Sequence, residues 1–135
     1  MTSGTDLAKQ WLAGSPFVAK LGIRVDRIGD GEADLVLPFE ASLATMADVV
    51  HGGALATLID TAAAAAAWAG AEAPENLRGS TAAASIVYVG AARGRDVAAS
   101  ARVIRRGRNL VFVEVQATTP DGITIASGLV TYRIG

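Results

Sequence analysis

A long alanine-rich segment, residues 52–68, most constrains the fold of this chain. It begins at a pair of glycines, ends at a tryptophan and contains six consecutive alanines, residues 62–67. Alanine is the best helix former, and no proline or glycine follows the opening pair, so we expect one long helix. Small side chains on all sides of a helix allow a curved sheet to wrap closely against it. Packing alone is therefore a sufficient explanation of the alanine run.

Alternating or continuous apolar runs bounded by turn residues predict the strands. They are expected at residues 23–28, 32–37, 81–89, 96–105, 110–118 and 123–132, with turns at 29–31, 106–109 and 120–122. A short helix (6–13), a helical turn (16–21) and two loops (41–50 and 70–76) complete the predicted elements. One helix and one sheet must bury their apolar faces on each other, so we expect a single α+β domain over residues 1–135.

Composition excludes several classes of function. The formal net charge is −1, without a basic stripe, which gives no support for a nucleic-acid partner. The chain has no cysteine and one histidine, which excludes thiol catalysis and argues against a metal site. The first sixteen residues lack the pattern of a secretory signal, so we expect a cytoplasmic enzyme.

A membrane-spanning helix is the alternative interpretation of residues 49–71, which are apolar throughout much of their length. Asp60 lies at the centre of this stretch, where a charge costs roughly 2.5–3.5 kcal/mol on insertion scales. Most of the apolar residues are alanines, which are weak hydrophobes. A helix buried in a soluble core is favoured, with no membrane partner.

The chemistry is expected where the long helix begins. His51, the only histidine, stands directly before Gly52 and Gly53. A helix that begins at a glycine pair offers free backbone N–H groups to a carbonyl or oxyanion. Asp60 follows about two and a half turns beyond His51 and can lie near a substrate bound there. This arrangement suits an enzyme that acts on an acyl carbonyl.

The segment from Val50 to Ala62 resembles the HGG-x6-D signature of hotdog-fold acyl-CoA thioesterases of the phenylacetate-degradation type. The resemblance continues through residues 81–92 after the helix, the basic stretch 105–108 and the turn at 121–122. It implies the hotdog fold, a long central helix wrapped by a curved antiparallel sheet. It also implies hydrolysis of an acyl-CoA to a free acid and coenzyme A, without a metal or redox cofactor.

The resemblance implies a role for each catalytic candidate. The backbone N–H of Gly52 would polarise the thioester carbonyl, aided by the helix dipole. Asp60 would act as nucleophile or as general base toward water. His51 would orient the loop or the substrate at the pocket edge. Thr81 would lie near the carboxylate of a neighbouring subunit. On their own, a histidine before a helix is often only a cap and a helical aspartate only faces solvent.

Further candidates would bind substrate. Gly53 shares the face of Asp60, where small neighbours leave room for a ligand. Thr45 stands where the family often has asparagine, and could place a water. The basic hairpin offers Arg106, Gly107 and Arg108 for coenzyme A phosphates, with a solvated turn as the alternative.

The chain departs from the family at three places. Thr45 and Asp48 replace an asparagine and a glycine before His51, and Gly90-Ala91-Ala92 replaces Arg-Pro-Ala. These departures leave open a non-catalytic acyl-CoA-binding or regulatory module. A hydratase is a weaker alternative, because its Asp/His pair is absent. Exposed sheet edges and the family's intersubunit sites predict a homo-oligomer, a dimer or a dimer of dimers.

Overall fold

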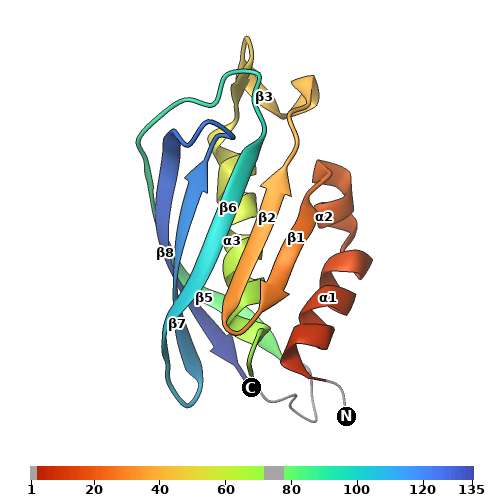
Figure 1. The fold of residues 1–135 in the computed structure, drawn as a ribbon, viewed down its shortest axis with the longest axis vertical. Helices are drawn as coiled ribbons and strands as arrows, with labels where there is room; N and C mark the ends of the chain where they lie inside the picture. The colour runs from red at the N-terminus through yellow and green to blue at the C-terminus, as the bar shows by residue number, and fades with distance from the viewer. Residues whose placement is uncertain (1–2, 72–77) are drawn as a thin grey trace.

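The fold is described from a computed structural model, which covers residues 3–71 and 78–135 (Figure 1). The loop predicted at residues 70–76 therefore lies mostly outside the described residues. The chain runs through α1 (Gly4–Gly14), α2 (Pro16–Leu21), β1 (Arg24–Gly29), β2 (Glu32–Leu37), a 3-10 turn η1 (Ala41–Leu43), β3 (Ala44–Met46), β4 (Val49–Val50), α3 (Gly52–Trp68), β5 (Gly79–Tyr88), β6 (Val97–Arg106), β7 (Leu110–Thr118) and β8 (Thr124–Ile134).

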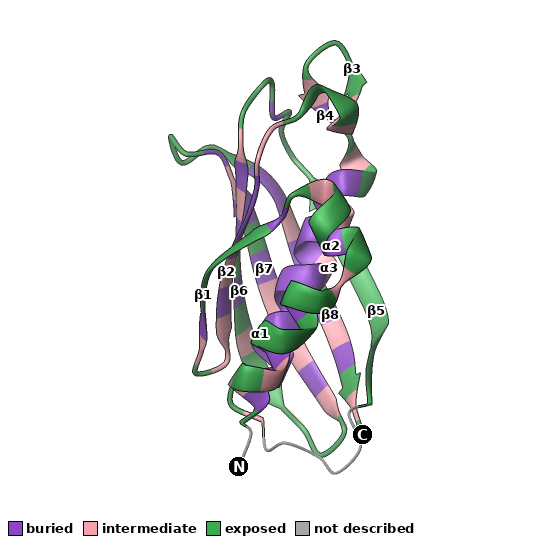
Figure 2. Ribbon diagram, turned by 90° about the vertical axis from the view of Figure 1, so that its right-hand side faces the viewer, coloured by how far each residue is buried: buried purple, intermediate pink, exposed green. Residues whose placement is uncertain are grey.

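Six strands form one antiparallel sheet in the order β1-β2-β6-β7-β8-β5. The sheet curves around α3, which lies along its concave face, and α1 packs on the outer side of that helix (Figures 1 and 2). The α+β class and the hotdog architecture are confirmed. In this order β1 and β5 are the two edge strands.

The alanine run lets α3 approach the sheet closely. Residues 62–67 are buried, together with Leu58 and Ile59. On β8, a Cβ added to Gly128 would lie 2.9 Å from Cγ2 of Ile59, so only glycine allows this approach. Both the helix and the sheet therefore contribute small residues to the contact.

Two predicted elements differ from the structure. Residues 41–50 are not a plain loop, because η1 and the short hairpin β3–β4 lie within them. The alternation over residues 23–28 does not hold either, since Val25 is 39% exposed while Ile23 and Ile28 are buried. The register with β2 shifts between Val25 and Arg27, and this irregularity on an edge strand breaks the regular in–out pattern.

Candidate functional site

His51 caps the N-terminus of α3. Its Nδ1 accepts a hydrogen bond of 2.7 Å from the Gly53 N–H, and its backbone N–H donates to the Leu43 carbonyl at 2.8 Å. A Cβ at position 53 would lie 3.0 Å from that Nδ1, which explains the second glycine. The Gly53 N–H is thus already used by His51, so of the two glycine amides at the start of the helix it is not the one offered to a carbonyl. As an acceptor at Nδ1, neutral His51 carries its proton on Nε2.

The backbone amide of Gly52 is the candidate carbonyl-binding group. Within residues 3–71 and 78–135, no group accepts a hydrogen bond from the Gly52 N–H. The amide belongs to the first residue of α3, where the helix dipole favours a partial negative charge. Its own carbonyl accepts a hydrogen bond of 3.1 Å from the Tyr88 hydroxyl.

Asp60 is held by Thr81 of the same chain. The Thr81 hydroxyl donates a hydrogen bond of 2.6 Å to Oδ1 of Asp60, which is half-buried on the exposed side of α3. The resemblance implied a neighbouring subunit's carboxylate near Thr81, and within this chain Thr81 binds the carboxylate of Asp60. The hydrogen bond fixes one carboxylate oxygen, and none of the residues that the structure describes donates a hydrogen bond to the other.

An irregularity in β5 directs both of these hydroxyl groups toward α3. Thr81 and Tyr88 are seven residues apart, an odd spacing that places side chains on opposite faces of a regular strand. Against β8, however, the register shifts between Thr81 and Ala83, which leaves one extra residue in β5. Thr81 and Tyr88 consequently share the helix-facing side.

Gly52 and Asp60 of one chain cannot serve the same carbonyl by direct attack. Eight residues of helix separate them, about 12 Å along the axis. A carbonyl bound to an amide and attacked by a nucleophile spans at most roughly 7 Å. The sequence-based expectation that Asp60 lies near a substrate held at its own helix N-terminus is therefore wrong for a direct attack.

An apolar cavity of about 190 Å³ lies beside the cap. Its lining comes from α2, η1, β3 and the first turns of α3, and comprises Phe17, Leu21, Ser42, Leu43, Ala44, His51, Gly53, Ala54 and Thr57. Thr45 follows in sequence on the exposed β3, and no hydrogen bond joins its side chain to another described residue. The lining of the cavity beside His51 includes Ala44 but not Thr45.

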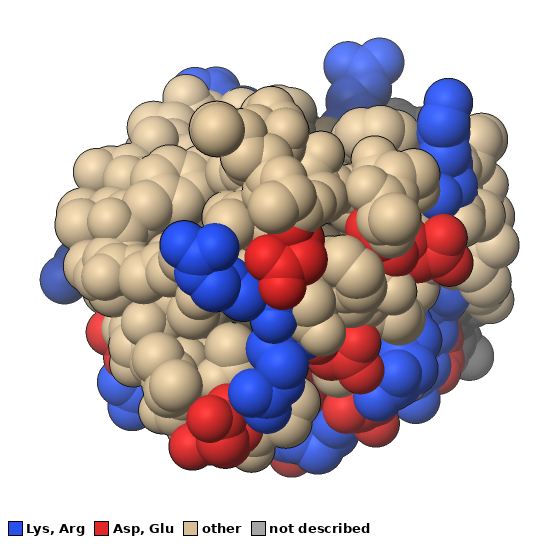
Figure 3. Space-filling model, turned by 90° about the horizontal axis from the view of Figure 1, so that it is seen from above, with Lys and Arg blue, Asp and Glu red and all other residues tan. Residues whose placement is uncertain are grey.

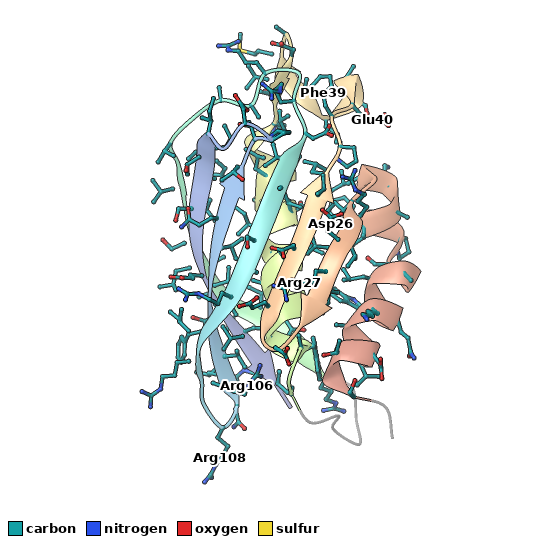
Figure 4. All side chains as sticks on the ribbon, viewed as in Figure 1. Asp26, Arg27, Phe39, Glu40, Arg106 and Arg108 are labelled. Carbon is teal, nitrogen blue, oxygen red and sulfur yellow. The ribbon has the colours of Figure 1, made fainter. Side chains whose placement is uncertain are left out.

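The residues predicted in the basic hairpin, 105–108, have different surroundings in the structure. Arg106 turns inward and donates to the carbonyls of Ala67 and Ala69 at 2.8 and 3.3 Å, at the C-terminal end of α3. Burial against this helix end lowers the pKa of Arg106. Arg108 instead projects from the tip of the hairpin, away from the body of the molecule (Figure 4). Gly107 closes the turn through its N–H, which donates to Leu110 at 2.7 Å.

A second hollow lies on this hairpin. Three arginines line it, and the sequence offered no reason to group them. About 450 Å³ in volume, it is lined by Arg105, Gly107, Arg108, Asn109, Leu110, Phe112 and Arg133. None of its three arginines pairs with a carboxylate among the described residues. At the opposite end of the molecule, cationic and anionic side chains lie interspersed beside a broad uncharged surface (Figure 3).

Two further observations concern metals and membranes. The part of the chain that the structure describes brings no three His, Asp or Glu residues together as metal ligands. Across the same residues, no helix has the length and hydropathy needed to traverse a membrane.

Sequence reasoning did not single out Tyr88, whose hydroxyl contacts the Gly52 carbonyl. The sequence places it near the end of a predicted strand, where the parity of a regular strand separates it from Thr81. An aromatic hydroxyl at the strand end was the only signal available.

The chain resembles known proteins over most of its length. The family model of the thioesterase superfamily matches residues 47–126. A thioesterase family protein from Silicibacter pomeroyi has a TM-score of 0.89 at 26% identity, over 98% of this chain and 100% of that one. The E. coli PaaI protein of the phenylacetic acid degradation operon has a TM-score of 0.84 at 22% identity, over 100% and 97%. A hypothetical thioesterase from Streptococcus pneumoniae, solved with coenzyme A, has a TM-score of 0.74 at 20% identity, over 84% and 85%.

Proposed function

Because this chain belongs to the thioesterase superfamily, we propose that it hydrolyses an acyl-CoA thioester to a free acid and coenzyme A. Thioester hydrolysis in general is the activity that the family membership supports. The acyl-CoA substrate and the roles of individual residues are our proposal. The cytoplasmic location expected from the sequence stays a prediction.

Two observations carry the proposal: the Gly52 amide at the start of α3 has no acceptor among the described residues, and the Asp60 carboxylate is oriented in the middle of that helix. The Gly52 N–H would bind the thioester oxygen and stabilise its developing negative charge. Asp60, held by Thr81, would attack the carbonyl carbon or remove a proton from the attacking water. The C–S bond then breaks, the sulfur takes up a proton, and water supplies the hydroxyl group of the acid.

We propose that each active site takes Gly52 from one copy of the chain and Asp60 from another. The axial separation of about 12 Å within one helix requires this for direct attack. A two-fold axis that pairs two β5 strands antiparallel also sets the two α3 helices antiparallel. In the dimer that we propose, the N-terminus of one helix would lie beside the middle of the other, so that Gly52 of one chain would face Asp60 of its partner.

The edge strand β5 supports this pairing. Its ten residues carry no charge, and nearly all of them are exposed at the free edge of the sheet (Figure 2). Proteins commonly protect such edges with charged residues, proline or a covering element. An uncharged strand with a free edge is suited to continue its sheet into a second copy.

Two further features favour coenzyme A as the leaving group. The hollow of Arg105, Arg108 and Arg133 offers three permanent cations for phosphate groups, with the ring of Phe112 beside them. The S. pneumoniae structural neighbour was solved with coenzyme A.

The apolar cavity of about 190 Å³ beside His51 would hold the acyl group, and its volume favours a small acyl group.

The first test is release of free coenzyme A from a panel of acyl-CoAs of increasing size. We expect turnover that is greatest for small acyl groups. Tight binding of acyl-CoA without turnover would instead identify a non-catalytic binding module.

The second test mixes two inactive variants. Gly52→Pro removes the N–H at the first helical position, where proline is tolerated, and Gly52→Ala keeps the N–H as the matched control. When Gly52→Pro chains are mixed with Asp60→Asn chains, each heterodimer has one intact composite site. That site takes Gly52 from the Asp60→Asn chain and Asp60 from the Gly52→Pro chain. We expect roughly a quarter of wild-type activity after random exchange of subunits. If each site belonged to one chain, the mixture would stay inactive.

A further inference from the structure

Tyr88 belongs to neither of the two groups assigned to the reaction, yet it contacts one of them. Its hydroxyl donates to the Gly52 carbonyl, and its ring lies in van der Waals range of the position that a Cβ on Gly52 would occupy, 3.5 Å away. The side chain is 49% exposed, so burial of its ring is incomplete. Core packing alone therefore does not account for it.

The hydrogen bonds of Tyr88 and His51 act on one peptide group. The carbonyl of Gly52 and the N–H of Gly53 are opposite ends of the same planar unit. Tyr88 holds the carbonyl end at 3.1 Å, and Nδ1 of His51 holds the amide end at 2.7 Å. Two side chains from distant parts of the sequence thus clamp this one plane.

The clamp acts where the backbone has the greatest freedom. Glycines flank the plane on both sides, and glycine populates more backbone conformations than any other residue. The preceding peptide plane is held separately, because the His51 carbonyl accepts from Ala54 and Leu55 at 2.9 and 3.2 Å. The two planes meet at the Gly52 Cα, and the Gly52 N–H lies in the first of them. Holding the second plane as well restricts rotation about the Gly52 Cα, which fixes the direction of this N–H.

We infer that Tyr88 is a positioning residue, which with His51 orients the Gly52 amide for the thioester carbonyl. This inference rests on the proposed function. It also gives β5 two roles, since the strand orients the carboxylate through Thr81 and the amide through Tyr88. An oxyanion donor contributes most when its direction is fixed before the substrate binds.

The test is Tyr88→Phe, which removes the hydroxyl and keeps the ring against Gly52. Ser85→Ala is the matched control, because it deletes a hydroxyl from β5 at a position paired with Leu129 on the other face of the sheet. Steady-state kinetics with an acyl-CoA would give kcat and KM. Amide hydrogen exchange followed by NMR would report on the Gly53 N–H without any need for activity.

For Tyr88→Phe we expect kcat to fall about tenfold, KM to stay within about twofold, and Gly53 exchange to accelerate. Ser85→Ala should change none of these. A kcat within about twofold of wild type would overturn the inference, and so would a lower kcat with unchanged Gly53 exchange. If the wild type hydrolysed no thioester, the proposed function would fail, and unchanged Gly53 exchange would still refute the clamp.

Discussion

The Thr81 hydroxyl and the Asp60 carboxylate form a hydrogen bond of 2.6 Å within one chain. The bond joins the edge strand β5 to the middle of α3, and it depends on the extra residue that turns Thr81 toward the helix. The carboxylate proposed for catalysis is therefore oriented by the strand that is also proposed to join two copies.

Replacing Asp60 by asparagine tests the central chemical role. Asparagine nearly preserves the shape and can still accept from Thr81, but it is neither a base nor an anionic nucleophile. We expect a loss of ~10²–10⁴-fold in turnover with the fold intact, measured by coenzyme A release and circular dichroism. Turnover within a few-fold of wild type would exclude Asp60 from the reaction.

Changes at Thr81 separate orientation of the carboxylate from the chemistry itself. Thr81→Val removes the donor while keeping the shape, whereas Thr81→Ser retains a hydroxyl. A hydrogen bond to a charged group contributes about 1.5–3 kcal/mol, so Thr81→Val should lower kcat by roughly 10–100-fold. Thr81→Ser should recover most of that loss. Equal activity of the two variants would show that the hydroxyl is dispensable.

Charges placed on β5 test the assembly. We expect the wild type to sediment as a dimer or larger at micromolar concentration. Lysines at Ala82 and Ala83 would repel across the strand pairing, so the double variant should be monomeric, folded and inactive. A fully active monomer, of either wild type or variant, would contradict the composite site.

The strongly patterned elements were predicted from the sequence nearly residue by residue. The bounds of α3 (Gly52–Trp68), β2 (Glu32–Leu37) and β7 (Leu110–Thr118) are confirmed. In each of these, a continuous pattern of apolar or helix-forming residues ends at a clear stop, so local information is sufficient. The hairpin of β3 and β4 was missed because strands of three and two residues are too short for a periodicity.

The contacts within the site depended on information that is not local. Tyr88 and Thr81 face α3 together only because one extra residue shifts the parity of β5. Arg106 was predicted to bind phosphate, and nothing in its neighbouring residues indicates that it instead reaches the end of α3, 37–39 residues earlier in the chain. The motif at residues 51–60 was recognisable, whereas the partners that orient it come from long-range packing.

The two arginines of the hairpin should respond differently to removal. Arg106 donates two hydrogen bonds to the last carbonyls of α3, so Arg106→Ala should destabilise the protein by about 1–3 kcal/mol. Arg106→Lys, with a single ammonium group, should recover part of this. The midpoint of thermal unfolding measures the effect. A midpoint unchanged by Arg106→Ala would show that Arg106 does not stabilise the end of α3.

Arg108, at the exposed tip, should instead act on substrate binding alone. If the hollow that it shares with Arg105 and Arg133 holds a coenzyme A phosphate, Arg108→Ala should raise KM several-fold, roughly the effect of losing one exposed ion pair. The value of kcat should stay unchanged, because the phosphates bind alike in the ground and transition states. High salt should reduce the difference between variant and wild type, since exposed charges are screened. With an acyl-pantetheine, which lacks the nucleotide, the KM of the variant and that of the wild type should be equal. An unchanged KM for acyl-CoA would show that Arg108 is only a solvated turn residue.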